Sequence, residues 1–117
     1  MIELHRVYEH SRTHGTRFLV ERLWPRGITK ESLHFSDWLK DVAPSDALRR
    51  WFQHDTAKWA EFQRRYRTEL DQRPEAWAPI LTVARAGDVT LLYSSHDTEH
   101  NNAVVLRDYL NERLGQR

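Results

Sequence analysis

The 117-residue chain carries 18 basic and 17 acidic side chains, a formal net charge of +1, and this near balance argues against a dedicated nucleic-acid binder. The length fits one domain, which we expect to span residues 1–117. The lack of cysteine excludes disulfides, thiolate nucleophiles and cysteine metal sites. The start does not read as a signal peptide and no apolar run could span a bilayer, so we expect a cytoplasmic protein without a membrane partner.

Two short strands are predicted near the start of the chain. Residues 2–8 alternate apolar and polar side chains, the period of a half-buried strand, and residues 17–23 form a more apolar second strand. The polar loop between them contains Gly15 and is shorter than a parallel crossover requires. An antiparallel pair is therefore favoured, although the two strands need not be neighbours.

Helical patterns fill the middle of the chain after the turn Trp24-Pro25-Arg26-Gly27. Apolar residues at spacings of three and four predict a first helical segment over 35–42, which Pro44 stops. Ser45 is the expected N-cap of the next helix. Asp55 or Thr56 is the expected cap of a longer helix, whose apolar stripe is Trp59, Phe62, Tyr66 and Leu70.

A further helix, a strand and a last helix complete the pattern. Pro74 fits the first turn of that helix, Pro79 predicts a kink or a later start, and Gly87 ends it. Residues 89–93 read as the third strand. The last helix is marked by the apolar stripe Leu106, Tyr109, Leu110 and Leu114. Together these elements predict an α/β fold with a small mixed or mostly parallel three-stranded sheet packed by about five helices.

The first candidate site is the polar stretch between the third strand and the last helix. A helix N-terminus that follows a strand leaves backbone N–H groups free to bind anions, and ligands of open α/β sheets usually lie at such points. The expected ligand-binding residues of this stretch are Ser94, Ser95, His96, Asn101 and Asn102. The alternative is simple helix capping, because Ser94-Ser95-His96-Asp97 matches the capping-box pattern and Asp97 or Thr98 could itself be the cap.

The second candidate site is the turn after the second strand. If that strand lies beside the third and runs parallel to it, Arg22 and Arg26 can reach an anion held at the serine loop, and Trp24 can stack on a planar ring. The alternative is that Arg22 pairs with a core carboxylate and Trp24 fills the core.

Two His-Asp pairs, His54-Asp55 and His96-Asp97, place an imidazole beside a carboxylate. The candidates for proton transfer are His54, Asp55, Asp97 and His100. Asp55 is as easily a helix cap. His96 and His100 have the spacing of a two-histidine metal site only on a continuous helix, and a turn is predicted there, so no metal is predicted. The sequence identifies no cofactor.

Several motifs, in order along nearly the whole chain, resemble the YeaO-like proteins, a branch of a bacterial family of unknown function. They are Arg22-Leu23-Trp24-Pro25-Arg26-Gly27, Trp38-Leu39-Lys40-Asp41, Ala43-Pro44-Ser45, the stretch 48–55, Leu92-Tyr93-Ser94, and Asp97 followed by His100-Asn101-Asn102-Ala103. The resemblance implies a compact α/β domain and supplies no established reaction. The family pattern commonly has Asp where this chain has Glu21, and Lys where it has His96. If that lysine binds phosphate in the family, His96 can take over this role only when its imidazole is protonated.

These observations favour a protein that binds a nucleotide-like or other anionic ligand, with an enzymatic action on that ligand left open. A non-enzymatic interaction module that docks a protein through a Trp-rich face is the alternative. A DNA-binding transcriptional regulator ranks last, because no helix-turn-helix pair with a basic face is found. The substrate and the oligomeric state stay open.

Overall fold

The computed structural model describes residues 1–9 and 15–115, and over these residues it has an α/β fold, as predicted. The strands are β1 (Ile2–Arg6), β2 (Thr16–Leu19), β3 (Asp37–Trp38) and β4 (Val89–Tyr93). The α-helices are α1 (Asp46–Phe52), α2 (Trp59–Asp71), α3 (Pro74–Ala86) and α4 (Asn102–Leu114). Two 3₁₀ helices, η1 (Lys40–Val42) and η2 (Thr56–Lys58), precede α1 and α2. The sheet thus has one strand more than the predicted three.

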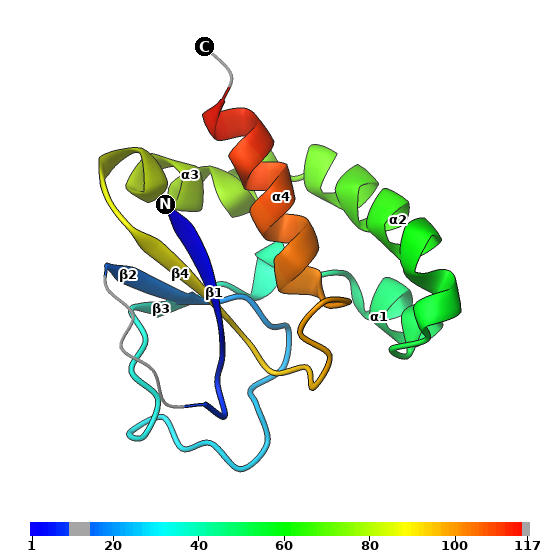
Figure 1. Cartoon of the computed structure of the whole chain (residues 1–117), viewed down its shortest axis with the longest axis horizontal. Coiled ribbons are helices and arrows are strands. Elements are labelled where there is room, and N and C mark those ends of the chain that lie inside the picture. The colour runs from blue at the N-terminus through cyan, green and yellow to red at the C-terminus, as the bar shows by residue number, and fades with distance from the viewer. Residues whose placement is uncertain (10–14, 116–117) are drawn as a thin grey trace.

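The described strands form one sheet in the order β1-β4-β2-β3, and every pairing is parallel. Leu91 of β4 lies between Leu4 of β1 and Phe18 of β2. The predicted antiparallel pair is therefore wrong, because β4 separates the first two strands. Because the strands are parallel, their carboxyl ends lie at one edge of the sheet, and the segments that follow β2 and β4 run through the lower part of Figure 1.

The helix predicted over residues 35–42 is also wrong. Phe18 and Leu19 of β2 pair with Asp37 and Trp38, which form the short edge strand β3. Leu39 N then donates to Leu19 O at 2.9 Å, so the backbone finds its partners in a neighbouring strand instead of along a helix. The apparent helical stripe divides between two sides of the sheet, because Trp38 packs on one face and Val42 on the other.

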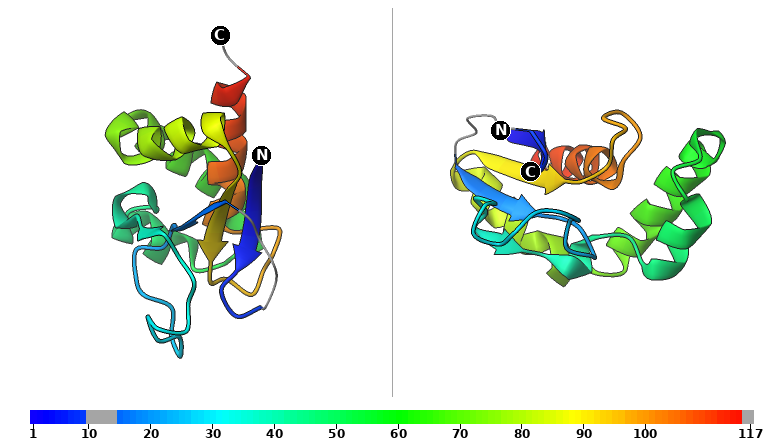
Figure 2. Two further views of the ribbon diagram at one scale, coloured as in Figure 1. Left: turned by 90° about the vertical axis from the view of Figure 1, so that its left-hand side faces the viewer. Right: turned by 90° about the horizontal axis from the view of Figure 1, so that it is seen from below.

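The two faces of the sheet are covered differently. One face carries the helix-side core, in which buried residues of β1, β2 and β4 pack against α1, α2, α3 and α4. The other face carries the loop-side cluster of Val7, Leu19, Leu33 and Leu92, covered by the aromatic residues of the loop between β2 and β3. The left-hand view of Figure 2 shows this loop, in light blue to cyan, at the bottom of the molecule, with α3 and α4 above it.

Local signals set the helix ends largely as predicted. Ser45 caps α1 by accepting from Leu48 N at 3.1 Å, and Asp55 caps η2 by accepting from Ala57 N at 3.0 Å. The structure begins α3 at Pro74 and keeps Pro79 inside it, so of the two alternatives for Pro79, a kink or a later start, the later start is wrong. The first turn of α3 is anchored by Trp77, whose indole N–H donates to Leu70 O of α2 at 2.8 Å. Across the described ranges, no helix combines the length and the apolar character needed to cross a membrane.

Candidate ligand-binding cleft

A cleft of about 760 Å³ lies at the edge where the strands end. Its walls come from the segments that follow β1, β2 and β4, together with α1 and one residue of α2. β2 lies beside β4 and parallel to it, which is the condition under which the two candidate sites were expected to meet. The carboxyl edge of a parallel sheet is also the common ligand position in open α/β folds.

Most of the predicted site residues line this single cleft. They are Arg22, Trp24, Arg26, His54, Ser94, Ser95, His96, Asp97, Asn101 and Asn102. Asp55 and His100 are not part of the lining. The structure therefore brings together the two candidate binding segments, but it separates the proposed proton-transfer residues.

Four arginines line the cleft: Arg6, Arg22, Arg26 and Arg49. Arg6 is held in place by Ser95, since its Nε donates to the Ser95 carbonyl at 2.9 Å. Arg22 donates to the carbonyls of Ala43 and Pro44, at 3.2 and 3.0 Å, and not to a core carboxylate. Within the described part of the chain, neither Arg22 nor Arg26 forms an ion pair, so both positive charges remain available to an anion.

Glu21 is a cleft residue that the sequence reasoning did not select. It follows β2 directly after Val20, and its Oε1 accepts a hydrogen bond from Ser94 N at 3.1 Å. Burial raises the pKa of the Glu21 carboxyl to about 7, against the opposing effects of the hydrogen bonds from Ser94 and the charge of Arg49. This carboxyl therefore changes its charge near neutral pH.

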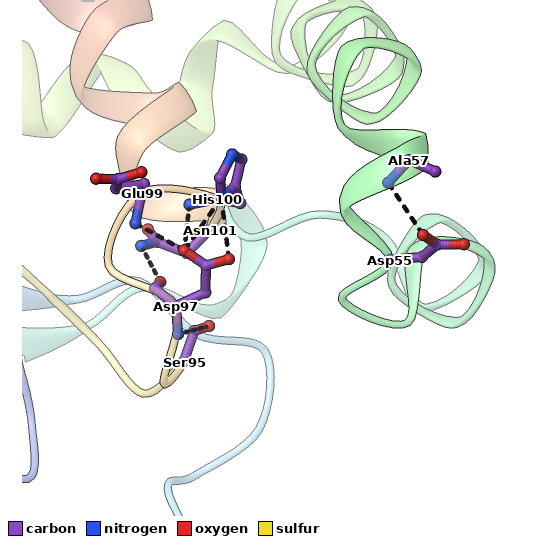
Figure 3. A network of polar contacts seen from close by, with 7 residues as sticks. All are labelled: Asp55, Ala57, Ser95, Asp97, Glu99, His100 and Asn101. Carbon is purple, nitrogen blue, oxygen red and sulfur yellow. Dashed lines mark hydrogen bonds and ion pairs between the residues drawn. The ribbon is translucent and has the colours of Figure 1, made fainter.

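Asp97 organises the loop between β4 and α4, as Figure 3 shows. Its Oδ1 accepts from the backbone N–H groups of Glu99 and His100, both at 2.9 Å, and its Oδ2 lies 2.9 Å from His100 Nδ1. Because these hydrogen bonds favour the ionised form, they lower the pKa of Asp97. The His100 ring also packs edge-on against Trp59, with ring centroids 5.1 Å apart. Both side chains are thus occupied in holding the loop.

Asn101, and not Asp97 or Thr98, is the N-cap of α4. Its Oδ1 accepts from Val104 N at 3.1 Å, while its Nδ2 donates to Asp97 O at 2.8 Å. The neighbouring Asn102 donates from Nδ2 to Val20 O at 2.8 Å and so ties the helix start to the end of β2. The capping alternative therefore holds for this stretch, but at a different residue.

Asp55 lies apart from the Asp97 loop, beside Ala57 at the start of the α2 segment (Figure 3). His54 lines the cleft from a left-handed backbone conformation with φ of 57°.

Trp24 packs edge-on against Phe35 and Trp38, and its indole N–H donates to Ile28 O. It therefore fills the loop-side cluster as well as lining the cleft. Among the residues that the structure describes, no group of three or more His, Asp or Glu side chains could hold a metal ion.

Arg6 and Arg49 are further cleft residues that the sequence reasoning missed. Arg6 ends β1, and its place at the cleft follows once β1 is known to run parallel to β4, with Arg6 opposite Tyr93. Arg49 and Arg50 both lie in the last turn of α1 and both are exposed, and nothing in the local sequence distinguishes them. Only Arg49 is on the side of α1 that lines the cleft.

Comparisons with known proteins agree with the resemblance to YeaO-like proteins. A family model described as the inactive DUF488-N3 subclade matches residues 1–117. The uncharacterized protein YeaO of Escherichia coli (strain K12) is 39% identical over 110 residues, which cover 93% of this chain and 96% of that protein. The uncharacterized protein Rv3073c of Mycobacterium tuberculosis (strain ATCC 25618 / H37Rv) is 36% identical over 113 residues, 96% of this chain and 95% of that protein. No solved structure matches the chain significantly.

Proposed function

The chain belongs to the YeaO-like family and matches the inactive DUF488-N3 subclade over its whole length, and we propose that it binds a small, nucleotide-like anionic ligand without transforming it. The observation that carries the proposal is the concentration of four arginines around one cleft in a chain whose net charge is only +1. Two carboxyl groups, of Glu21 and Asp97, share the lining, and the first is only partly ionised at neutral pH. Arg49 also pairs with Asp46, at 3.3 Å, but the other three arginines still outnumber the two carboxyl groups of the lining, so the cleft is locally cationic.

The size and the apolar walls of the cleft support a ligand with a planar part. Its volume of about 760 Å³ falls in the range of small-molecule sites. Phe52 and Phe62 contribute buried aromatic surface to the lining, and Pro25 adds an apolar side chain. An anion at the arginines with a base or similar ring against this surface would use both kinds of wall.

The contacts of the proton-transfer candidates support ligand binding more than catalysis. Asp97 and His100 bond to each other and to the backbone, and Asp55 caps η2 outside the cleft. A general acid or base must reach the proton that it transfers, and these three groups are already committed to holding loops and helix ends. The fourth candidate, His54, packs against Phe52 in the wall of the cleft. The description of the matching subclade as inactive also supports binding without catalysis.

A thermal-shift titration with inorganic sulfate, ribose 5-phosphate and adenosine 5′-monophosphate tests the proposal. We expect the melting temperature to rise, most for the nucleotide, because it alone carries both an anion and a ring. Arg26→Ala should weaken the apparent affinity about tenfold or more, since a charge-assisted hydrogen bond contributes about 1.5–3 kcal/mol. Arg50→Ala is the matched control, because Arg50 is exposed on α1 and does not line the cleft.

Two results would contradict the proposal. Equal loss of affinity in Arg26→Ala and Arg50→Ala would place the anion outside the cleft. Turnover of the bound nucleotide, followed by chromatography of the mixture over hours, would show that the protein is an enzyme. Asn101→Ala is unsuitable for this test, because Asn101 is 2% exposed and caps α4.

A further inference from the structure

We infer that the carboxyl group of Glu21 takes up a proton when an anion enters the cleft, so that the affinity for the anion rises as the pH falls. This inference rests on the proposed function and adds a regulation of the same site. It also assigns Glu21 the role of a residue that selects the charge of the ligand. Glu21 lies among the arginines that line the cleft.

The backbone fixes Glu21 at the end of the sheet. Val20 N donates to Leu92 O at 3.1 Å, so the chain is still paired with β4 one residue before Glu21. Trp38 donates from its indole N–H to the Glu21 carbonyl at 2.6 Å. The Glu21 carboxyl is then held by Ser94 N at 3.1 Å, which leaves it little freedom to move away from an incoming anion.

Charged and titratable groups face this carboxyl from each neighbouring element. These are Arg49 of α1, which also pairs with Asp46 at 3.3 Å, and the phenol of Tyr66 of α2. Arg22 follows Glu21 in the chain, and its guanidinium donates to the carbonyls of Ala43 and Pro44. Burial, followed by the charge of Glu21, raises the pKa of Tyr66, so this phenol stays neutral through the physiological range. The rest of the lining adds the ionisable side chains of Arg6, Arg26, His54, His96 and Asp97.

An ionised Glu21 competes with the ligand for the same cations. At pH 7 about half of the Glu21 side chains are ionised, because burial raises the pKa of this carboxyl to about 7. A bound anion near Arg49 offsets the positive charge that favours the carboxylate and also repels it, so protonated Glu21 is favoured in the complex. By linkage, the protein takes up protons when it binds the anion.

The sign of the pH dependence follows from this linkage. Below pH 7 the carboxyl is already mostly protonated, so the affinity should level off. Above pH 7 a proton must be bound together with the anion, and the affinity should fall by up to about tenfold per pH unit for one linked proton. The fall should end where Glu21 of the complex itself becomes ionised.

Isothermal titration calorimetry with sodium sulfate tests the inference, because sulfate does not titrate in this pH range. Titrations between pH 6 and 8.5, in buffers of different ionisation enthalpy, give the affinity and the number of protons taken up. For the native protein we expect about half a proton at pH 7 and nearly one at pH 8. Glu21→Gln should bind sulfate at pH 8 about as tightly as the native protein does at pH 6, whereas Glu21→Asp should keep the proton uptake.

His54 and His96 also line the cleft, and their imidazoles need their own control. In the double variant His54→Asn with His96→Asn, the proton uptake above pH 7 should persist, and this measurement does not depend on the folding of Glu21→Gln. Loss of the uptake in the double variant would assign the proton to a histidine and overturn the inference. A native affinity that does not change between pH 7 and 8 would overturn it as well, whereas the absence of sulfate binding even at pH 6 would contradict the proposed function itself.

Discussion

At the scale of single residues, Thr90 is a polar side chain buried in the central strand. It is 0% exposed, and its hydroxyl has no hydrogen-bond partner among the described residues. A buried hydroxyl without a partner carries a desolvation cost of about 1–3 kcal/mol. We therefore expect Thr90→Val, which keeps the shape of the side chain, to raise the free energy of unfolding by about 1 kcal/mol.

Urea unfolding followed by circular dichroism measures this change. Thr82→Val is the matched control, because Thr82 lies on the exposed side of α3 and its hydroxyl donates to Ala78 O. The control should change the stability by less than about 0.5 kcal/mol. A destabilised Thr90→Val would show that the hydroxyl has a partner that matters for folding.

Some residue roles can be predicted from the sequence because they depend on neighbours in the chain. Ser45 and Asp55 are caps, as their residue types and positions indicated. The role of Glu21 could not be predicted, because its pKa depends on burial against β4 and on Arg49, which lies 28 positions further along the chain. Local sequence carries no information on that contact.

At the scale of elements, the start of α4 depends on one side chain. Asn101 uses both polar ends of its amide, accepting from Val104 N and donating to Asp97 O, in a buried position. Replacement by alanine removes the N-cap and leaves the Asp97 carbonyl without this donor. We expect Asn101→Ala to lower the free energy of unfolding by about 2 kcal/mol.

The control for this prediction lies on the same helix. Asn111 is exposed on α4, and Asn111→Ala should leave the stability within about 0.5 kcal/mol of the native value. Chemical denaturation of both variants measures the two free energies of unfolding. If the two variants lose the same stability, the helix start is held by the backbone of the loop and not by the Asn101 side chain.

The elements that the sequence failed to predict are those created by a distant partner. The helices α2, α3 and α4 follow from apolar spacing and end signals within each segment. β3 has only two residues, Asp37 and Trp38, and exists because β2 offers an open edge to pair with. The insertion of β4 between β1 and β2 is also a long-range choice, and for this reason the antiparallel prediction was wrong.

At the scale of the whole molecule, the cleft is assembled from segments far apart in the chain. The sequence predicted that Arg22 and Arg26 would meet Ser94 and Asn101 on the condition that β2 and β4 are parallel neighbours, and the structure meets that condition. The sequence could not predict that Arg6 lines the cleft, because the direction of β1 decides at which edge of the sheet this residue lies. Whether the assembled cleft binds an anion stays a prediction for the titrations described above.

The unequal covering of the two sheet faces leads to a last prediction, about how the molecule opens. The helix-side core joins three strands to all four α-helices, whereas the loop-side cluster is a small group under a loop without regular structure. Local opening is cheapest where few buried apolar contacts are lost. The loop between β2 and β3 should therefore separate from the sheet at a lower free energy than global unfolding.

Native-state hydrogen exchange at low concentrations of denaturant distinguishes the two kinds of opening. The amides of Leu33 and Ser36, which donate to Thr29 O and Arg17 O, should exchange through local openings that depend little on denaturant. The amides of β4, which is paired on both sides and buried along its whole length, should exchange only by global unfolding, with the full dependence on denaturant. One shared opening free energy for both sets would show that the loop is as strongly integrated as the helices. Because Trp24 and Arg26 belong to this loop, an independent opening would also provide the motion by which a ligand enters and leaves the cleft.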